Sequence, residues 1–441
     1  MNRLEELKNS PKRVFLAALG CDKNTVDGEY MLGDLISLGF ELTEDPDDAD
    51  LFIVNTCCFI DEAKAESVNT ILECLPYVEE NGARLVVTGC MAERYREELA
   101  QEIPEIDGFM GVKDTDRILS LFDEDDAAEN NASVSAAEQA DAPRVRYIPE
   151  GEATAYLKIS EGCNRNCTYC AIPGIRGRHR SRTPEAVLDE ARLLREKGVK
   201  ELILVAQDLT QYGEDHPEYP DFNKLLTRIA EETGFPWIRL LYLYPEGITP
   251  ELVETVRTHE NILPYFDIPV QHTRPEILKR MGRKITPEEI EARINMIREA
   301  LPDAVIRTSI ITGFPGETEE IHQAMLADLE RIGFDRLGAF RYSVEENTPA
   351  ASFPDQVDDD TKERRYEEIA ALQEKISTQR NARLKNRVLP VLIETDEGDE
   401  TYSGRLYCDA PEIDCIIYVN SPENLEPGNF YDVRVIRALG Y

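Results

Sequence analysis

Basic residues are scarce in this sequence. The 441-residue chain carries 49 Lys and Arg against 86 Asp and Glu, which gives a formal net charge of −37. Because such a surface repels polyanions on average, generic charge-driven binding of DNA or RNA is excluded, and a cationic partner such as a basic protein is favoured. Hydrophobic residues still make up 42% of the chain, which is enough to build the cores of about three domains.

Long apolar runs are also missing. No segment approaches the roughly 20 apolar residues of a membrane span. The polar stretch from Met1 to Arg13 has no apolar core of the signal-peptide type. We therefore expect a cytoplasmic protein with no membrane partner. Its ten cysteines are then expected to be reduced, which favours metal-binding or catalytic roles over disulfides.

Acid–base catalytic signatures are absent from the sequence as well. The five histidines are scattered, and no Ser-His-Asp arrangement, H-E-x-x-H motif or P-loop occurs. Only His272, in the segment IPVQH, directly follows a predicted barrel strand, and a structural hydrogen bond is its favoured role. No catalytic acid or base is therefore assigned.

The patterns of apolar residues divide the chain into four parts. Residues 1–121 alternate strands and helices, which predicts a parallel α/β sheet domain. Residues 122–146 form an acidic linker, since residues 121–142 hold seven acidic residues and no basic ones. Six strand–helix repeats within residues 147–378 predict a partial (βα)6 barrel, because eight would close a standard barrel. Short strands between turn residues in 379–441 predict a small β-barrel.

Three closely spaced cysteines stand out in the segment GCNRNCTYCAIP. Cys163, Cys167 and Cys170 form a C-x3-C-x2-C motif directly after the first predicted barrel strand, at the face where barrel active sites lie. Three thiolates do not fill a four-coordinate zinc site. They can hold three irons of a 4Fe–4S cluster and leave the fourth iron open to an exogenous ligand, which favours catalysis. Three unrelated loop thiols are the disfavoured alternative.

A second set of cysteines is spread along the first domain. Cys21, Cys57 and Cys90 each lie just past the carboxyl end of a predicted parallel strand, and such ends form one ligand-binding edge. Together they predict a second cluster, against the alternative of three buried cysteines that pack as small hydrophobes. Cys58 competes for the middle position, but Cys57 is preferred. Packing is the expected role of the cysteines that match no ligand pattern: Cys74, Cys408 and Cys415.

Other candidate residues lie after predicted barrel strands. In SIITGFPGE, Gly313 and Phe314 are expected to contact a cofactor, although a plain strand–helix turn is the alternative. Tyr169, next to Cys170, is assigned to the same cofactor site. Gln207 is also assigned to it, and Asp208 has even odds of a role there. The basic run from Arg176 to Arg182 either neutralises a carboxylate or phosphate of a ligand, or forms a solvated, ion-paired loop.

These motifs resemble one known family over nearly the whole chain. GCNRNCTYCAIPGIRGRHRSR resembles the cluster loop of radical S-adenosylmethionine methylthiotransferases, the strand-end cysteines resemble the ligands of that family's auxiliary cluster, and the tail resembles its TRAM domain. The resemblance implies two 4Fe–4S clusters and S-adenosyl-L-methionine. Cys163, Cys167 and Cys170 would bind the cluster whose open iron chelates the cofactor.

The resemblance also implies a reaction. Cleavage of the cofactor would give a 5′-deoxyadenosyl radical that abstracts hydrogen from an unactivated C–H bond. The auxiliary cluster, bound by Cys21, Cys57 and Cys90, would carry the sulfur to be inserted. A low-potential donor such as flavodoxin or ferredoxin would supply the electron. The absence of an acid–base pair fits this chemistry, since cofactors carry the difficult step.

Two features of the tail favour one branch of the family. Its segment APEIDC resembles APEIDG of the branch that methylthiolates an aspartate β-carbon in ribosomal protein S-twelve of the small subunit, with Cys415 in place of glycine. From Asn381 to Tyr441 the chain has 6 basic and 11 acidic residues, which suits a basic protein substrate better than RNA. We therefore predict the ribosomal protein as the substrate. The alternatives are a modified adenosine in tRNA and a non-catalytic iron–sulfur carrier.

Overall fold

The computed structural model describes residues 12–115, 118 and 145–440, which form two compact units. The first unit contains the chain up to Pro149 together with Glu161–Cys163 and Ala171–Arg178. The second contains Glu150–Ser160, Asn164–Cys170 and everything from His179 onward. Almost all of the predicted acidic linker, 122–146, lies outside the described residues. No helix in the described ranges is both long enough and apolar enough to cross a membrane.

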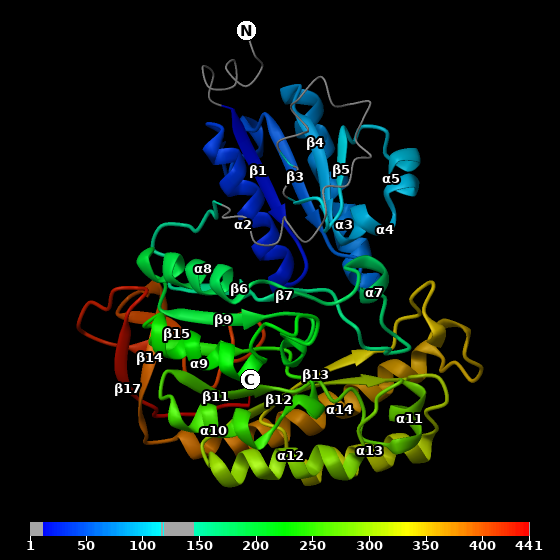
Figure 1. The fold of residues 1–441 in the computed structure, drawn as a ribbon, viewed down its shortest axis with the longest axis vertical. Coiled ribbons are helices and arrows are strands. Elements are labelled where there is room, and N and C mark those ends of the chain that lie inside the picture. Colours follow the sequence, from blue (N-terminus) through cyan, green and yellow to red (C-terminus); the bar gives the residue numbers. More distant parts are fainter. Residues whose placement is uncertain (1–11, 116–117, 119–144, 441) are drawn as a thin grey trace. The chain divides into compact units, whose positions relative to one another are not determined.

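A parallel five-stranded sheet with the order β2-β1-β3-β4-β5 forms the centre of the first unit (Figure 1). This confirms the predicted α/β sheet. The short edge strands β2 and β5 were not predicted. The elements of this unit are β1 (Arg13–Ala18), α2 (Asp22–Ser37), β2 (Glu41–Leu42), β3 (Leu51–Thr56), α3 (Asp61–Asn81), β4 (Arg84–Gly89), α4 (Cys90–Arg94), α5 (Arg96–Glu102), β5 (Gly108–Met110) and α7 (Ile172–Ile175).

Both faces of this sheet are buried, because helices cover each of them. Side chains alternate along a strand, so Phe52 and Ile53 of β3 point to opposite faces. Phe52 packs in one core with Ile71 of α3, whereas Ile53 packs in another with Met31 of α2. The continuous apolar runs of the central strands are therefore typical of a parallel sheet with two buried faces.

The second unit is built on a parallel six-stranded sheet with the order β13-β12-β11-β10-β9-β6, which confirms the predicted open barrel of six repeats. Its strands are β6 (Thr154–Lys158), β9 (Glu201–Val205), β10 (Trp237–Leu240), β11 (Ile262–Asp267), β12 (Val305–Thr312) and β13 (Arg336–Arg341). Its helices are α8 (Pro184–Glu196), α9 (Phe222–Glu232), α10 (Pro250–Thr258), α11 (Pro275–Arg280), α12 (Pro287–Ala300), α13 (Glu319–Ile332) and α14 (Asp359–Asn381). A short pair, β7 (Ser160–Glu161) and β8 (Arg180–Ser181), stands apart from this sheet.

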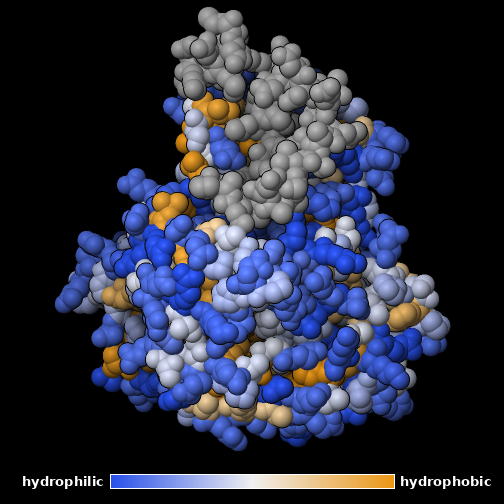
Figure 2. All heavy atoms as spheres, viewed as in Figure 1, coloured by the Kyte–Doolittle hydropathy of each residue, from blue (hydrophilic) through white to orange (hydrophobic). Residues whose placement is uncertain are grey.

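Antiparallel strands of the tail correspond to the predicted small β-barrel. β14 (Val388–Gly398), β15 (Thr401–Arg405), β16 (Ile417–Asn420) and β17 (Phe430–Arg434) form a sheet with the order β16-β15-β14-β17, and bulges interrupt the pairing of β14 with β15. The tail shares one hydrophobic core with the barrel, in which Ile203 and Tyr265 pack together with Val391 and Tyr402. Hydrophilic residues cover most of the visible surface of the second unit, with small hydrophobic patches between them (Figure 2).

Candidate metal centres

The strand register of the first unit aligns the three strand-end cysteines. Thr56 of β3 lies opposite Gly89 of β4, so Cys57 and Cys90 follow at equivalent positions. β1 is the other neighbour of β3, and Cys21 follows the end of β1. All three cysteines therefore lie at the carboxyl edge of adjacent parallel strands, where α/β sheets bind ligands.

Two glycines allow the chain to turn tightly at this edge. Gly20 has φ +95°, and a Cβ on it would lie 2.8 Å from the Cβ of Cys57. Gly89 has φ +89°, and a Cβ on it would lie 2.5 Å from the carbonyl oxygen of Thr56. Side chains are therefore excluded at both positions by strain and by collision, and the backbone before Cys21 approaches Cys57 closely.

Asn24, in the first turn of α2, ties this edge together. Its Nδ2 donates to the carbonyl oxygens of Leu19 at 3.1 Å and Thr56 at 2.9 Å, and so links the ends of β1 and β3. The Sγ of Cys90 lies 3.8 Å from its Oδ1. Sequence analysis missed Asn24. The only available signal was a polar side chain three positions after Cys21.

None of the ten cysteines forms a disulfide, and burial affects those at the edge of the sheet. Burial raises the pKa of Cys90 to about 12, although the nearby Arg176 opposes the rise. Burial also raises the pKa of Cys57. Burial therefore disfavours the thiolate form of both side chains, and metal binding has to displace their protons. Cys58 and Cys74 pack in the hydrophobic core between the sheet and α3, to which Cys90 also belongs but Cys57 does not.

The donor set of this edge fits an iron–sulfur cluster better than a single ion. Within the part of the chain that the structure describes, no three His, Cys, Asp or Glu side chains lie close enough together to hold one metal ion. A cubane of four irons separates its thiolates more widely than a single ion does, and cysteine thiolates are its usual ligands. Such a cluster needs three thiolates at one place, and Cys21, Cys57 and Cys90 provide three thiols at one edge of the sheet.

In the second unit, the motif cysteine Cys167 lies among aromatic and cationic groups. Its Sγ is 3.6 Å from the Oη of Tyr244 and 4.0 Å from Nη1 of Arg283. The guanidinium groups of Arg283 and Arg165 lie 3.8 Å and 4.1 Å from the centre of the Tyr244 ring. The tyrosine beside Cys167 therefore gathers two guanidinium groups around this part of the motif. Sequence analysis missed Tyr244 and Arg283, because their approach depends on segments far apart in the chain.

Cys163 and Cys170, the other two cysteines of the motif, are also partly buried. The backbone N–H of Cys170 donates to the carbonyl oxygen of Cys167 at 3.2 Å. In the first unit, the N–H of Cys163 donates to Gly177 at 3.2 Å. Three partly buried cysteines in one short loop fit the donor set of a 4Fe–4S cluster.

The predicted cofactor contacts have different surroundings. Tyr169 is partly buried and packs edge-on against Phe314, with ring centres 6.5 Å apart. Phe314 itself is fully buried in an aromatic cluster. Gln207 is half-buried just beyond β9. The buried Asp208 accepts hydrogen bonds from Thr210 and pairs with Arg165 at 2.9 Å. The cofactor contacts of Tyr169, Gln207, Gly313 and Phe314 stay predictions.

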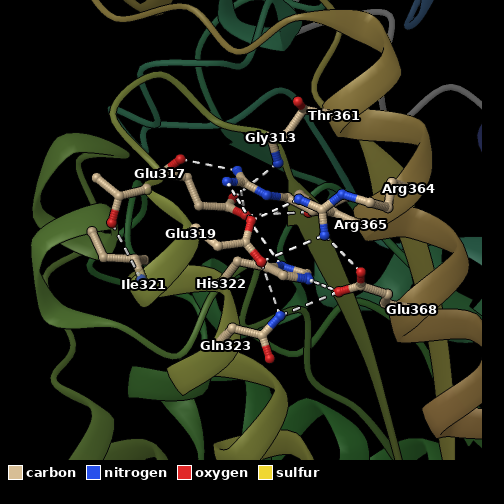
Figure 3. A network of polar contacts seen from close by, with 12 residues as sticks. Gly313, Glu317, Glu319, Ile321, His322, Gln323, Thr361, Arg364, Arg365 and Glu368 are labelled. Atoms are coloured by element: carbon tan, nitrogen blue, oxygen red, sulfur yellow. Dashed lines mark hydrogen bonds and ion pairs between the residues drawn. The ribbon is translucent and has the colours of Figure 1, made fainter.

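Glu317 holds the loop that contains Gly313 (Figure 3). Its carboxylate accepts from the backbone N–H of Gly313 at 2.9 Å and from Nη1 of Arg365 at 3.2 Å. The imidazoles of His322 and His272 lie 3.4 Å and 3.6 Å away. Burial alone would raise the pKa of Glu317, but its contacts with the two histidines and the charge of Arg365 lower it to about 2. Sequence analysis missed this network, which connects α14 to the loop.

The basic run after the motif divides in the structure. Arg176 is 1% exposed and contacts Asp27, Glu161 and Asn24 within the first unit. In the second unit, Arg182 pairs with Glu190 at 2.7 Å. Arg178 is exposed. Arg176 and Arg182 are ion-paired within the protein and Arg178 is exposed, which fits the alternative of a solvated, ion-paired loop.

Comparison with known families gives three matches along the chain. Residues 13–111 match the uncharacterized protein family UPF0004, residues 157–329 match the radical SAM superfamily, and residues 387–441 match the TRAM domain.

Curated relatives match almost the full chain. A protein of Clostridioides difficile named ribosomal protein uS12 methylthiotransferase RimO is 45% identical, with 97% of each chain covered. Proteins of the same name from Lachnoclostridium phytofermentans and Geobacter sulfurreducens are 43% and 42% identical, with at least 97% of each chain covered.

Solved structures show a related fold at low sequence identity. The radical S-adenosylmethionine methyltransferase TsrM from Kitasatospora setae, with tryptophan and a cofactor analogue bound, has a TM-score of 0.56 at 14% identity and covers 88% of this chain and 79% of its own. The cobalamin-dependent radical enzyme OxsB has a TM-score of 0.52 at 14% identity and covers 83% of this chain and 57% of its own. These likenesses concern the fold alone.

Proposed function

Because the chain belongs to the RimO family of radical S-adenosylmethionine methylthiotransferases, we propose that it transfers a methylthio group to the ribosomal protein uS12. The target atom is the β-carbon of an aspartate, as the APEIDC segment of the tail suggests. One observation carries this proposal: the identity of 42–45% extends over nearly the full length of relatives with this activity in their name.

One cluster and its cofactor belong to the part of the chain that matches the radical SAM superfamily. That superfamily uses a 4Fe–4S cluster and S-adenosyl-L-methionine, which together supply the reducing electron and the hydrogen-abstracting agent that an unactivated C–H bond requires. We propose that Cys163, Cys167 and Cys170 provide the three thiolate ligands. The Arg283 guanidinium lies beside Cys167 and brings a positive charge to the ligand, and Tyr244 holds that guanidinium in place.

The cofactor itself needs a rigid cradle beside the cluster. The carboxylate of Glu317 fixes the backbone N–H of Gly313 and so sets the path of the loop after β12. Tyr169 packs edge-on against Phe314, and Gln207 lies half-buried at the end of β9. We propose that all four residues contact the cofactor; the partial exposure of Tyr169 and Gln207 supports this, whereas Gly313 and Phe314 are buried.

A second cluster is the finer part of the proposal. Cys21, Cys57 and Cys90 supply its three thiolates, and one iron stays open for the sulfur that is inserted. The strand register and the two tight glycine turns support this assignment, because they bring three cysteines to one edge of the sheet. An external donor of low potential, such as flavodoxin or ferredoxin, completes the proposed system.

The charge of the tail supports a protein substrate rather than tRNA. Residues 381–441 contain 6 basic and 11 acidic residues. Three of those basic residues are already engaged by carboxylates: Arg383 with Asp335, Arg387 with Asp303, and Arg405 with Glu201. The tail therefore offers little free positive charge to phosphates, whereas its acidic surface attracts a basic protein.

Mass spectrometry of a deletion strain tests the substrate. uS12 should lose a mass equal to methylthio replacing hydrogen, while tRNA nucleosides keep theirs. Loss of the mark from tRNA alone would overturn the proposal.

An in vitro assay tests the assignment of the two cysteine sets. With reductant and S-adenosylmethionine, Cys163→Ala should release no 5′-deoxyadenosine. Cys21→Ala should still release it but leave a uS12 substrate unmodified. The control Cys415→Ala, outside both cysteine sets, should behave as the parent does. A fully reconstituted parent that releases none would indicate an iron–sulfur carrier.

A further inference from the structure

Arg176 belongs to the segment 171–178 of the first unit and lies beside one of its strand-end cysteines, Cys90. It directly follows α7, whose residue Ile175 packs in the same core as Cys90. The side chain is 1% exposed, so its positive charge is removed from water. A buried guanidinium is costly unless its donors are satisfied, and its partners therefore show what it is placed to hold.

The two ends of the guanidinium have different partners. Nη1 donates to Asp27 at 3.2 Å and to the two carboxylate oxygens of Glu161 at 3.0 Å and 3.1 Å. Nη2 donates to the Oδ1 of Asn24 and lies 3.8 Å from the Sγ of Cys90. One end is therefore anchored by carboxylates, and the other is directed at the cysteine edge.

The contact with Asn24 extends this influence along the edge. Through its Nδ2, Asn24 joins the carbonyl groups of Leu19 and Thr56, which lie next to Cys21 and Cys57 in the chain. Arg176 thus contacts one candidate ligand directly and orients the amide that fixes the backbone beside the other two. If Arg176 served only to anchor the segment 171–178, its contacts with the two carboxylates would be sufficient.

Local charge explains why a cation is needed here. The carboxylates of Asp27 and Glu161 already place two negative charges beside Arg176, and cluster thiolates would add more. Lys23 of α2 does not offset them in full, since it pairs with Asp22 at 3.2 Å. Arg176 is therefore the cation that contacts both the carboxylates and the thiol.

We propose that Arg176 is a positioning residue of the second cluster, which holds the Cys90 thiolate by a hydrogen bond and stabilises the reduced, more negative state of the cluster. The inference rests on the proposed function, because it requires that Cys21, Cys57 and Cys90 bind a cluster. Arginine suits this place because its fork donates in two directions at once, which a lysine ammonium on its flexible stem does not reproduce.

The test uses the full chain with Cys163, Cys167 and Cys170 all replaced by Ala, so that only the second cluster contributes to the spectra. Arg176→Gln, Arg176→Lys and the exposed control Arg178→Gln are made in this background. After anaerobic reconstitution, the iron content, the circular dichroism and the reduction potential are measured. Arg178→Gln should match the background protein. Arg176→Gln should keep its fold, lose iron and shift the remaining cluster to a more negative potential, whereas Arg176→Lys should restore most of the potential.

A second readout requires no Arg176→Gln variant. In background protein labelled with ¹⁵N-arginine, the reduced cluster should show a weak ¹⁵N hyperfine coupling, which Arg176→Lys should abolish. The inference is overturned if Arg176→Gln loads fully at an unchanged potential, or if the labelled background protein shows no coupling. Should the background protein itself bind no iron, the second cluster of the proposed function fails instead.

Discussion

Replacement of Arg405 by Met should destabilise the second unit, because it breaks a buried group of three charges. Glu201 is fully buried between Arg239 and Arg405, each of which donates to one carboxylate oxygen at 2.6 Å. Arg405, on β15 of the tail, also donates to the backbone oxygen of Asp409 at 3.1 Å. Glu201 lies on the barrel strand β9, so this contact joins the barrel to the tail.

The magnitude follows from the loss of one partner of a buried ion pair. Such a loss costs about 3–5 kcal/mol, since the remaining charge stays buried with less compensation. Met fills a similar volume, so cavity formation adds little to the change in the free energy of unfolding. Burial would raise the pKa of Glu201, but the two arginines hold it below its usual value. In the variant that pKa should rise.

The single tryptophan provides the assay. Trp237 lies in the second unit, and its ring centre is 4.6 Å from that of Phe430 on β17, so its fluorescence reports the packing of barrel against tail. Urea titrations should show the loss for Arg405→Met. The exposed control Arg434→Met should change the free energy by less than about 0.5 kcal/mol. A loss below about 1 kcal/mol for Arg405→Met would refute the reasoning that the buried charges hold the tail in place.

Two further predictions concern the candidate sites. In the protein that lacks Cys163, Cys167 and Cys170, Cys57→Ser should lose reconstituted iron and Cys58→Ser should keep it, because Cys58 packs in the apolar core. If iron analysis shows the reverse, Cys58 is the ligand. The pKa of the Glu317 carboxyl group is lowered from 4.5 to about 2, which corresponds to a contribution of roughly 3 kcal/mol to the free energy of unfolding. This contribution is fully present above pH 4.5 and is lost as the pH falls towards 2. The stability difference between the parent and Glu317→Gln, followed by Trp237 fluorescence, should shrink over that range, and a difference independent of pH would contradict the network.

Strong periodic patterns made most of the fold predictable. The apolar run of β3 is buried at every position, and the predicted strand at Leu51–Val54 falls inside it. β2 and β5 were missed because two or three residues carry no periodic signal. The predicted strand Ile238–Tyr244 ends earlier, at Leu240, because Tyr242 has a positive φ of 63° and its N–H donates to the side chain of Asp267.

The sequence identified the cysteines of the candidate sites but not the groups around them. Cysteine spacing is a local signal, whereas the partners of Cys167 come from residues about 80 to 120 positions further along the chain, as with Tyr244 and Arg283. The basic run illustrates the same limit. Both of its interpretations were consistent with the sequence, and only the burial of Arg176 separates that residue from the exposed Arg178.

The division of the chain between its units has a practical consequence for fragments. The first unit is assembled from three separate stretches, and two of them come from the motif region, far beyond the natural cut at Pro149. A fragment that stops there would expose the core surface on which Ile175 packs and leave the buried Asp27 without its cation. A fragment that stops at Pro149 would therefore be incomplete, and a fragment meant to contain the whole first unit has to extend to Arg178.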